Sequence, residues 1–303
     1  MDCESWLLDY FHPQGFKCPN CQAEVSDAHP FRQAKKSRLQ VYRCNQCKCV
    51  YNLYTNTVFK QRHLTPQQVI LLLRGVLKGE TSAALADELG VSYQTVLDIR
   101  RDLQANAAHL QPDIPLPDHV TESDEMFQNV GEKGHEHFDP DDPPRQRANK
   151  RRGRGTYAND RPPILGTVGR ETGQVRLRVV DNTQGVTLQA HVHRFTLPES
   201  ILNTDKYQSY NRIERERDTV CHSANEYARD DDGDGFHEVH CNSVEGMWTD
   251  VRNFLRPFKG VHKRYCLDMS LSVSFDAISN TSPRPLSLNW SAFTLSTHEP
   301  WVF

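Results

Sequence analysis

The 303-residue sequence predicts a multidomain α/β protein: an N-terminal zinc ribbon, a helix-turn-helix, and then a larger α/β domain with a mixed sheet. Two Cys-x-x-Cys pairs lie within 16–59, helical periodicity follows over 64–106, and strand-like runs precede a helical stretch at 242–258. The predicted parts are a ribbon at 1–62, a helix-turn-helix at 63–110, a linker at 111–119, the α/β domain at 120–266 and a tail at 267–303.

The two cysteine pairs predict a structural zinc site. Cys18, Cys21, Cys44 and Cys47 offer four soft ligands, which fill a tetrahedral zinc ion and leave no position for water. Such clustering suits thiolate ligands in a reducing compartment better than a disulfide framework, and Cys49 is expected to be a neighbour of the site. The ribbon is also locally basic. Lys35, Lys36 and Arg38 are therefore its candidate DNA contacts.

Three helices are predicted after the ribbon. Thr65-Pro66 suits a helix start, a second helix follows Thr81, and the Gly90-Val91-Ser92 turn leads into a third. The tight turn between short amphipathic helices indicates a helix-turn-helix, although ordinary packing hairpins share this pattern. The candidate groove-facing residues are Ser92, Tyr93, Gln94, Thr95 and Arg100, with solvated helix surface as the alternative.

The remaining chain predicts a linker, an insertion and a sheet. The proline-rich segment 111–118 is expected to be a stiff linker, and 131–158, dense in Gly, Pro and charge, a mobile surface excursion. The predicted elements of the α/β domain are strands at 163–168, 175–180 and 200–204 and helices at 186–195 and 242–258.

Three carboxylates carry the predicted chemistry. Asp124, Asp205 and Glu245 singly resemble solvated turn residues, but together they come from two strands and one helix. Converging carboxylates can hold two divalent cations, and hard oxygen ligands suit Mg or Mn. Such a site supports in-line phosphoryl transfer without a histidine base.

The order of these motifs resembles the bacterial IS1595-type transposases, also called ISXO2-like. The similar segments are Ser123-Asp124-Glu125, the basic Gly-rich insertion, Asn203-Thr204-Asp205-x-Tyr207-x-x-Tyr210, His222 to Tyr227, and His240 to Trp248. The resemblance implies an RNase H-like catalytic fold with an Asp, Asp, Glu or Asn metal site. It also implies action on the double-stranded DNA of terminal inverted repeats, with at least a homodimer on DNA.

The third metal ligand has two candidates, because the family is described with either Asn or Glu there. Asn242 and Glu245 lie one helical turn apart, and Glu245 is preferred because an anionic oxygen compensates a divalent ion better. Arg252 stands where the family tends to carry a phosphate-contacting Lys. His240 is a further candidate for contact with the scissile phosphate or a metal-bound water.

The tail departs from the family. From about Leu267 it is rich in Ser, Thr and Pro, and a reading-frame slip is the preferred explanation. An inactive remnant that only binds DNA through zinc-dependent modules therefore stands beside the active enzyme, and an RNase H-like nuclease with another substrate is the third hypothesis. The absence of a long apolar run and of a signal peptide predicts a soluble, cytoplasmic protein without membrane contact.

Overall fold

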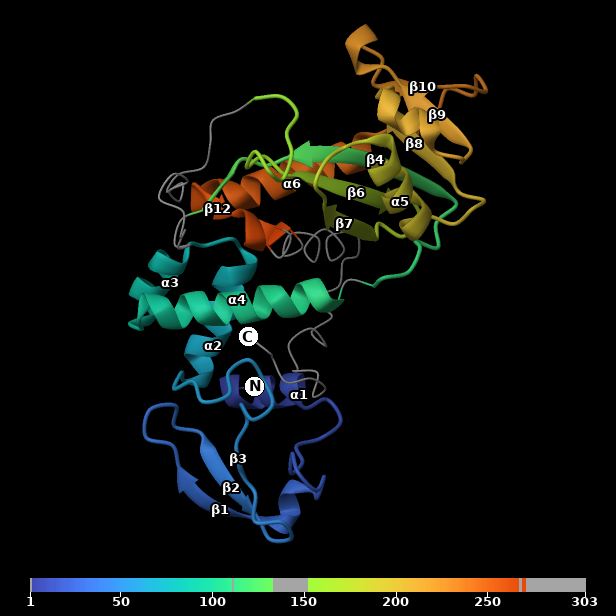
Figure 1. Ribbon diagram of the computed structural model, residues 1–303. Helices are drawn as coiled ribbons and strands as arrows, with labels where there is room; N and C mark the ends of the chain where they lie inside the picture. Colours follow the sequence, from blue (N-terminus) through green and yellow to red (C-terminus); the bar gives the residue numbers. More distant parts are fainter. Residues whose placement is uncertain (1, 111, 133–151, 267–268, 271–303) are drawn as a thin grey trace. The chain divides into compact units, whose positions relative to one another are not determined.

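The computed structural model describes residues 2–110, 112–132, 152–266 and 269–270. The chain divides into two compact units, the first ending at Leu110 and the second beginning at Gln111 (Figure 1). No helix within these ranges is long and apolar enough to cross a membrane.

The first unit begins with a helix that the sequence patterns did not reveal, α1 (Cys3–Phe11), capped by the Asp2 carboxylate on the Ser5 amide at 2.8 Å. A 3-10 turn, η1 (Val25–Asp27), then leads into an antiparallel sheet of order β1-β2-β3. Its strands are β1 (Ala28–Gln33), β2 (Gln40–Cys44) and β3 (Val50–Tyr51), as in a small ribbon.

The three predicted helices are confirmed as α2 (Pro66–Leu77), α3 (Ser82–Leu89) and α4 (Tyr93–Leu110). Thr65 and Gln68 form a reciprocal capping box at the start of α2, and Thr81 caps α3. Gly90 ends α3 at φ 63°, a left-handed conformation that glycine adopts without penalty. Each of these helix ends is therefore set by residues that lie within a few positions of it in the sequence.

The ribbon segment and the helices share one apolar core. Leu7 and Phe11 of α1 pack in the same cluster as Tyr54 and Phe59, which follow the sheet, and as Leu72 of α2. Residues 2–62 and 63–110 thus belong to one compact unit. Burial of this cluster stabilises the helices, which are too short to persist alone.

The second unit is built on a five-stranded mixed sheet of order β7-β6-β4-β8-β9. Strands β7, β6 and β4 pair antiparallel, whereas β4, β8 and β9 pair parallel. Their bounds are β4 (Val120–Phe127), β6 (Pro163–Gly169), β7 (Val175–Val179), β8 (Ile201–Asp205) and β9 (Arg217–Val220). The predicted mixed α/β architecture is confirmed.

Helices cover both faces of this sheet. Leu165 packs with Leu188 and Val192 of α5 (Gly185–Phe195), whereas the neighbouring Gly166 faces Trp248 of α6 (Asn242–Leu255). Because side chains alternate along a strand, α5 and α6 lie on opposite faces. The face of α6 carries every second residue of β4, including Asp124, which pairs in register with Gly166.

Short pairings complete the second unit. β5 (Val130–Gly131) pairs parallel with β12 (Val261–His262), and β10 (Ala228–Arg229) pairs antiparallel with β11 (Val239–His240). The Lys263 ammonium lies 3.1 Å from Glu132 and 3.3 Å from Asp160, and so joins the two sides of the predicted insertion. Residues 133–151 of that insertion lie outside the described residues. The 3-10 turns here are η2 (Gln208–Arg212), η3 (His222–Ala224), η4 (Arg256–Phe258) and η5 (Lys263–Tyr265).

The segment 112–119, predicted to be a stiff linker, packs within the second unit. Leu116 is fully buried and its amide bonds to the Phe195 carbonyl, while Asp118, also buried, accepts bonds from the amides of Glu171 and Thr172. Prolines stiffen a chain but do not prevent it from packing, so this segment belongs to the second unit. The predicted tail lies outside the described residues beyond residue 270.

Candidate active site

The three predicted carboxylates come from three elements of the second unit. Asp124 lies in the middle of β4, Asp205 is the last residue of β8, and Glu245 lies in the first turn of α6. Burial, together with the charges of Asp205 and Glu245, raises the pKa of Asp124 to about 6. The three carboxylates therefore lie close enough to affect one another as like charges.

Asp124 has one side-chain donor. The indole Nε1 of Trp248 donates to its Oδ2 at 3.0 Å. The ring fits because Gly166 lies opposite: a Cβ there would come within 2.8 Å of the Trp248 ring. Gly166 thus permits the close approach of α6 to the sheet that brings Glu245 beside β4.

The carboxylate set fits hard divalent cations in its chemistry. It offers only oxygen donors of negative charge, which Mg and Mn prefer. Among the described residues, the groups whose ligand atoms all lie within 4.8 Å of one another do not include Asp124, Asp205 and Glu245 together. A pair of ions about 3.5 to 4 Å apart takes its donors over a wider span than a single ion does.

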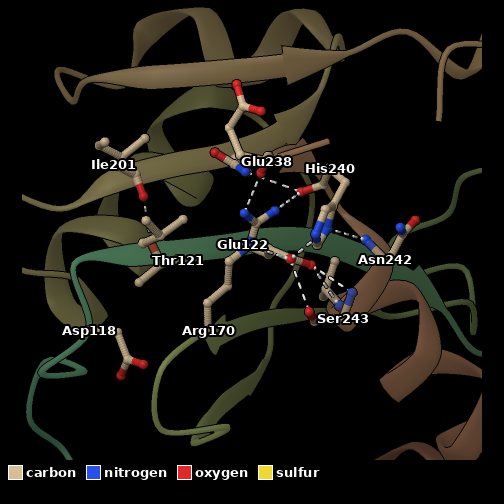
Figure 2. A network of polar contacts seen from close by, with 12 residues as sticks. Asp118, Thr121, Glu122, Arg170, Ile201, Glu238, His240, Asn242 and Ser243 are labelled. Atoms are coloured by element: carbon tan, nitrogen blue, oxygen red, sulfur yellow. Dashed lines mark hydrogen bonds and ion pairs between the residues drawn. The ribbon is translucent and has the colours of Figure 1, made fainter. Parts of the chain in front are cut away.

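A buried network holds the start of α6 against β4, and sequence patterns missed its centre, Glu122 (Figure 2). The Glu122 carboxylate is fully buried and accepts bonds from the amides of Ser243 and Val244 at 2.8 and 3.0 Å and from the Ser243 hydroxyl at 3.0 Å. These are the unpaired donors of the first turn of α6, where the helix dipole favours an anion. Glu122 thereby fixes the turn that carries Glu245.

Arg170 balances the buried charge of Glu122. Its Nε donates to the Glu122 carboxylate at 2.7 Å, and its other nitrogens donate to the main-chain oxygens of Glu238 and His240 (Figure 2). The guanidinium therefore ties β11 to β4 as well as to α6. The sequence signal was weak, because Glu122 stands among other polar residues in Thr121-Glu122-Ser123-Asp124, and nothing nearby in sequence revealed its partners.

His240 belongs to this network rather than to the carboxylate cluster. Its Nδ1 lies 3.2 Å from Glu122, and burial together with Arg170 lowers its pKa. The histidine beside the cluster is His222, whose Nε2 lies 3.2 Å from the Glu245 carboxylate. Asn242 is exposed at the start of α6, so both candidates for the third ligand remain on the accessible end of this helix.

Other charged groups surround the cluster. Arg252 is exposed two helical turns after Glu245. The pKa of Arg161 is lowered mainly by the burial of Arg161 itself and also by the charge of Arg252. Glu125 points to the opposite face, where Tyr210 donates to it at 3.0 Å. Burial and the charges of Asp124 and Asp205 raise the pKa of Glu125 to about 8.

The four predicted zinc ligands are brought together in the first unit. All four sulfur atoms lie within 4.8 Å of one another, with Cys18 to Cys47 at 3.4 Å and Cys21 to Cys44 at 3.5 Å. A tetrahedral zinc with bonds of about 2.3 Å needs sulfurs about 3.8 Å apart, so the set fits a metal ion. Cys49 is not one of these four.

The two cysteine turns have the same backbone. Gln22 and Lys48, each directly after the second cysteine of its pair, have φ of 60° and 62°. Their amides donate to the carbonyls of Cys18 and Cys44, respectively. This repeated tight turn aims both sulfurs of each pair to one point.

The position of Arg100 contradicts its prediction as a groove-facing residue. It is 3% exposed and donates to the Ser82 hydroxyl at 3.0 Å, so it braces α4 against α3 and does not face a groove. An arginine on an amphipathic helix looks like surface in sequence, although its position falls on the buried stripe. Ser92 and Thr95 bond to each other at the start of α4. The exposed members of the set are Lys35, Lys36, Arg38, Ser92, Tyr93 and Gln94.

A second acidic group lies between β10 and β11. Ligand atoms of Asp230, Asp232 and Glu238 lie within 4.8 Å of one another. Their loop is internally bonded, since Asp230 accepts from the amides of Gly233 and Gly235. The group is largely exposed, and its bonds explain the loop conformation.

Residues 124–268 match the family model of the ISXO2-like transposase domain. Over these residues the chain is similar to ISXO2-like transposase domains. The match begins at Asp124 and contains Asp205 and Glu245, so it spans every carboxylate of the candidate site. The resemblance of the sequence to IS1595-type transposases is confirmed.

A relative and two solved structures are similar to this chain over a larger part of its length. The relative is an uncharacterized protein in transposable element ISH50 of Halobacterium salinarum, 29% identical over 257 residues, covering 82% of this chain and 81% of the relative. The catalytic core of BIV integrase is 13% identical at a TM-score of 0.28, covering 55% and 86% of the two chains. A pre-cleavage Mos1 transpososome is 12% identical at 0.22, covering 70% and 77%. The family assignment therefore rests on the sequence matches.

Proposed function

We propose that the protein is a DDE-type transposase that cleaves and joins DNA strands at the terminal inverted repeats of an insertion sequence. The observation that supports this most is the convergence of Asp124, Asp205 and Glu245 within the transposase domain. The proposal includes an RNase H-like fold for residues 120–266, with β4 as the central strand that carries the first carboxylate.

The chain's own residues would prepare this site in three ways. Asp124, Asp205 and Glu245 supply the oxygens for Mg or Mn, which when bound would activate the attacking oxygen and stabilise the leaving oxygen. Trp248 orients Asp124 through its indole hydrogen bond. Glu122 and Arg170 hold the first turn of α6 so that Glu245 stays beside the strand. Preorganisation of this kind spares reorganisation during phosphoryl transfer.

DNA recognition is proposed for the first unit. Lys35, Lys36 and Arg38 are exposed between β1 and β2, and Tyr93 and Gln94 are exposed at the start of α4. Zinc at the four cysteines would hold the ribbon, and phosphate contacts would supply salt-dependent affinity. Pairing of two element ends calls for at least a homodimer on DNA.

The test is cleavage of a labelled duplex that carries the element's terminal repeat, with Mg or Mn present. Asp124→Asn and Asp205→Asn are expected to abolish strand cleavage. Asp250→Asn is the matched control, because Asp250 is exposed on the same helix as Glu245 and should leave cleavage unchanged. Glu245→Gln and Asn242→Ala, assayed separately, decide the third ligand.

The same assay separates the alternative functions. Binding of the repeat without any nicking by the unaltered protein supports the inactive remnant that uses only its DNA-binding modules. Equal cleavage of unrelated duplexes supports a nuclease with another substrate. Repeat-specific cleavage that persists in Asp124→Asn would contradict the proposed active site.

Zinc removal gives an independent prediction. A chelator or Cys44→Ser is expected to unfold the ribbon and lower the helical signal of the first unit, because the cysteine site holds the small sheet and the residues that follow this sheet pack in one apolar cluster with α2 to α4. Metal analysis should find one zinc per chain in the unaltered protein and none in the variant. Cys49→Ser is the control, and loss of zinc in that variant would contradict the assignment.

A further inference from the structure

A cavity of about 300 Å³ lies beside Asp205, at the end of β8. Its lining includes Arg154, Lys206, Tyr207, Cys221 and His222. This volume is at the lower end of ligand pockets and suits a group of the size of one nucleotide. The cavity adjoins the carboxylate site through Asp205, whereas its other lining residues have no part in the metal site proposed above.

One wall of the cavity is a flat stack. The Arg154 guanidinium carbon lies 3.5 Å from the centroid of the Tyr207 ring. Tyr207 is held in place, since its hydroxyl donates to the Thr183 carbonyl at 3.4 Å and its ring contacts Tyr210 edge-on at 6.3 Å between centroids. Guanidinium and aromatic planes are the surfaces on which unpaired bases stack.

The charges of the cavity suit a phosphodiester. Arg154 and Lys206 are exposed cations. Asp205, the proposed metal ligand, also lines the cavity. Glu226 lies 3.9 Å from Lys206, a separation at which an exposed pair is weak and yields to a stronger anion. A phosphate bound here would lie between these cations and the metal-binding carboxylates.

We propose that this cavity binds one nucleotide of the DNA strand directly beside the phosphate that is attacked, with its base on the Arg154–Tyr207 stack and its phosphate near Lys206. The inference rests on the proposed function, because it takes Asp205 to mark the reacting phosphate. The proposal also assigns a function to Arg154, which is the last residue of the arginine-rich run that precedes the strand at 163–169.

The test places 2-aminopurine at each nucleotide around the cleavage position of a terminal-repeat duplex. Stacking on the cavity wall is expected to change its fluorescence at one flanking position when the Asp124→Asn protein binds. Added to that background, Arg154→Ala should abolish this signal and weaken duplex binding about 5- to 10-fold, in the range of one lost stacking contact. Arg178→Ala, which removes an equally exposed arginine from β7 at the far edge of the sheet, should change neither.

Two further variants refine the result. Arg154→Lys keeps the charge and loses the plane, so it should retain salt-dependent binding without the fluorescence change. Tyr207→Ala removes the ring on which Arg154 stacks and should abolish the signal. An unchanged signal at every position in Arg154→Ala would overturn the proposal, even if cleavage by the unaltered protein succeeds. Conversely, an Arg154-dependent signal in a protein that never cleaves the repeat would sustain the nucleotide site and refute the transposase activity.

Discussion

Glu122 and Asp124 lie two residues apart on the same face of β4, but their carboxylates have opposite electrostatic surroundings. Glu122 is fully buried, paired with Arg170 and bonded to the first turn of α6. Asp124 receives one indole bond and faces the like charges of Asp205 and Glu245. One acid is neutralised within the protein and serves structure, whereas the other stays uncompensated and is available to an external cation.

The largest effect on stability should come from removing the charge of Glu122, the acid that is neutralised within the protein. Glu122→Gln leaves the buried Arg170 guanidinium without its counter-charge and is expected to lower the free energy of unfolding by about 3 kcal/mol or more. Urea denaturation measures this change. Glu122→Gln combined with Arg170→Met should recover part of the loss, because no unpaired charge then remains. A change below about 1 kcal/mol would show that the pair contributes little.

Removing the charge of Asp124 should instead stabilise the metal-free protein, and the size of this effect should depend on pH. The pKa of Asp124 is raised to about 6 from an ordinary value of 3.8, so the folded protein binds more protons than the unfolded chain between these values. Its destabilising effect is therefore absent below pH 4 and complete above pH 6. Asp124→Asn should raise the melting temperature of the metal-free protein by a few degrees at pH 7.5, about 1 kcal/mol or more, and not at pH 4.

Mg or Mn should reverse this difference. Ions in tenfold excess over their dissociation constant are expected to stabilise the unaltered protein by about 1.4 kcal/mol at pH 7.5 and the Asp124→Asn variant much less. Protonation of Asp124 should diminish the effect below about pH 6. Equal stabilisation of both proteins by the ion would contradict a role of Asp124 as a ligand.

The smallest expected effect concerns the hydrogen bond between α6 and Asp124. Trp248→Phe keeps most of the packing and removes the indole donor, at a cost of about 1 kcal/mol. Because this bond lowers the pKa of Asp124, its loss should move the pH midpoint of metal-induced stabilisation upward. The midpoint, read from melting temperatures across pH, should be unaffected by Trp6→Phe in the first unit.

The sequence predicted those features whose causes are local. The cysteine pairs, the Thr65 and Thr81 caps and the spacing of Val244, Met247 and Trp248 each act within a few residues, and the structure places their elements as expected. The role of Glu122 could not be predicted, because its partner Ser243 lies 121 residues away. Arg100 and the segment 112–119 were misjudged for the related reason that tertiary packing overrides the polarity and stiffness of the residues themselves.

The Lys263 ammonium has a consequence for how the domain tolerates change in length. It joins Glu132 and Asp160, and the Val130 amide also bonds to the Asp160 carbonyl, so both ends of the intervening stretch are anchored by the body of the domain. A change in the number of residues between Glu132 and Asp160 should therefore leave these contacts in place.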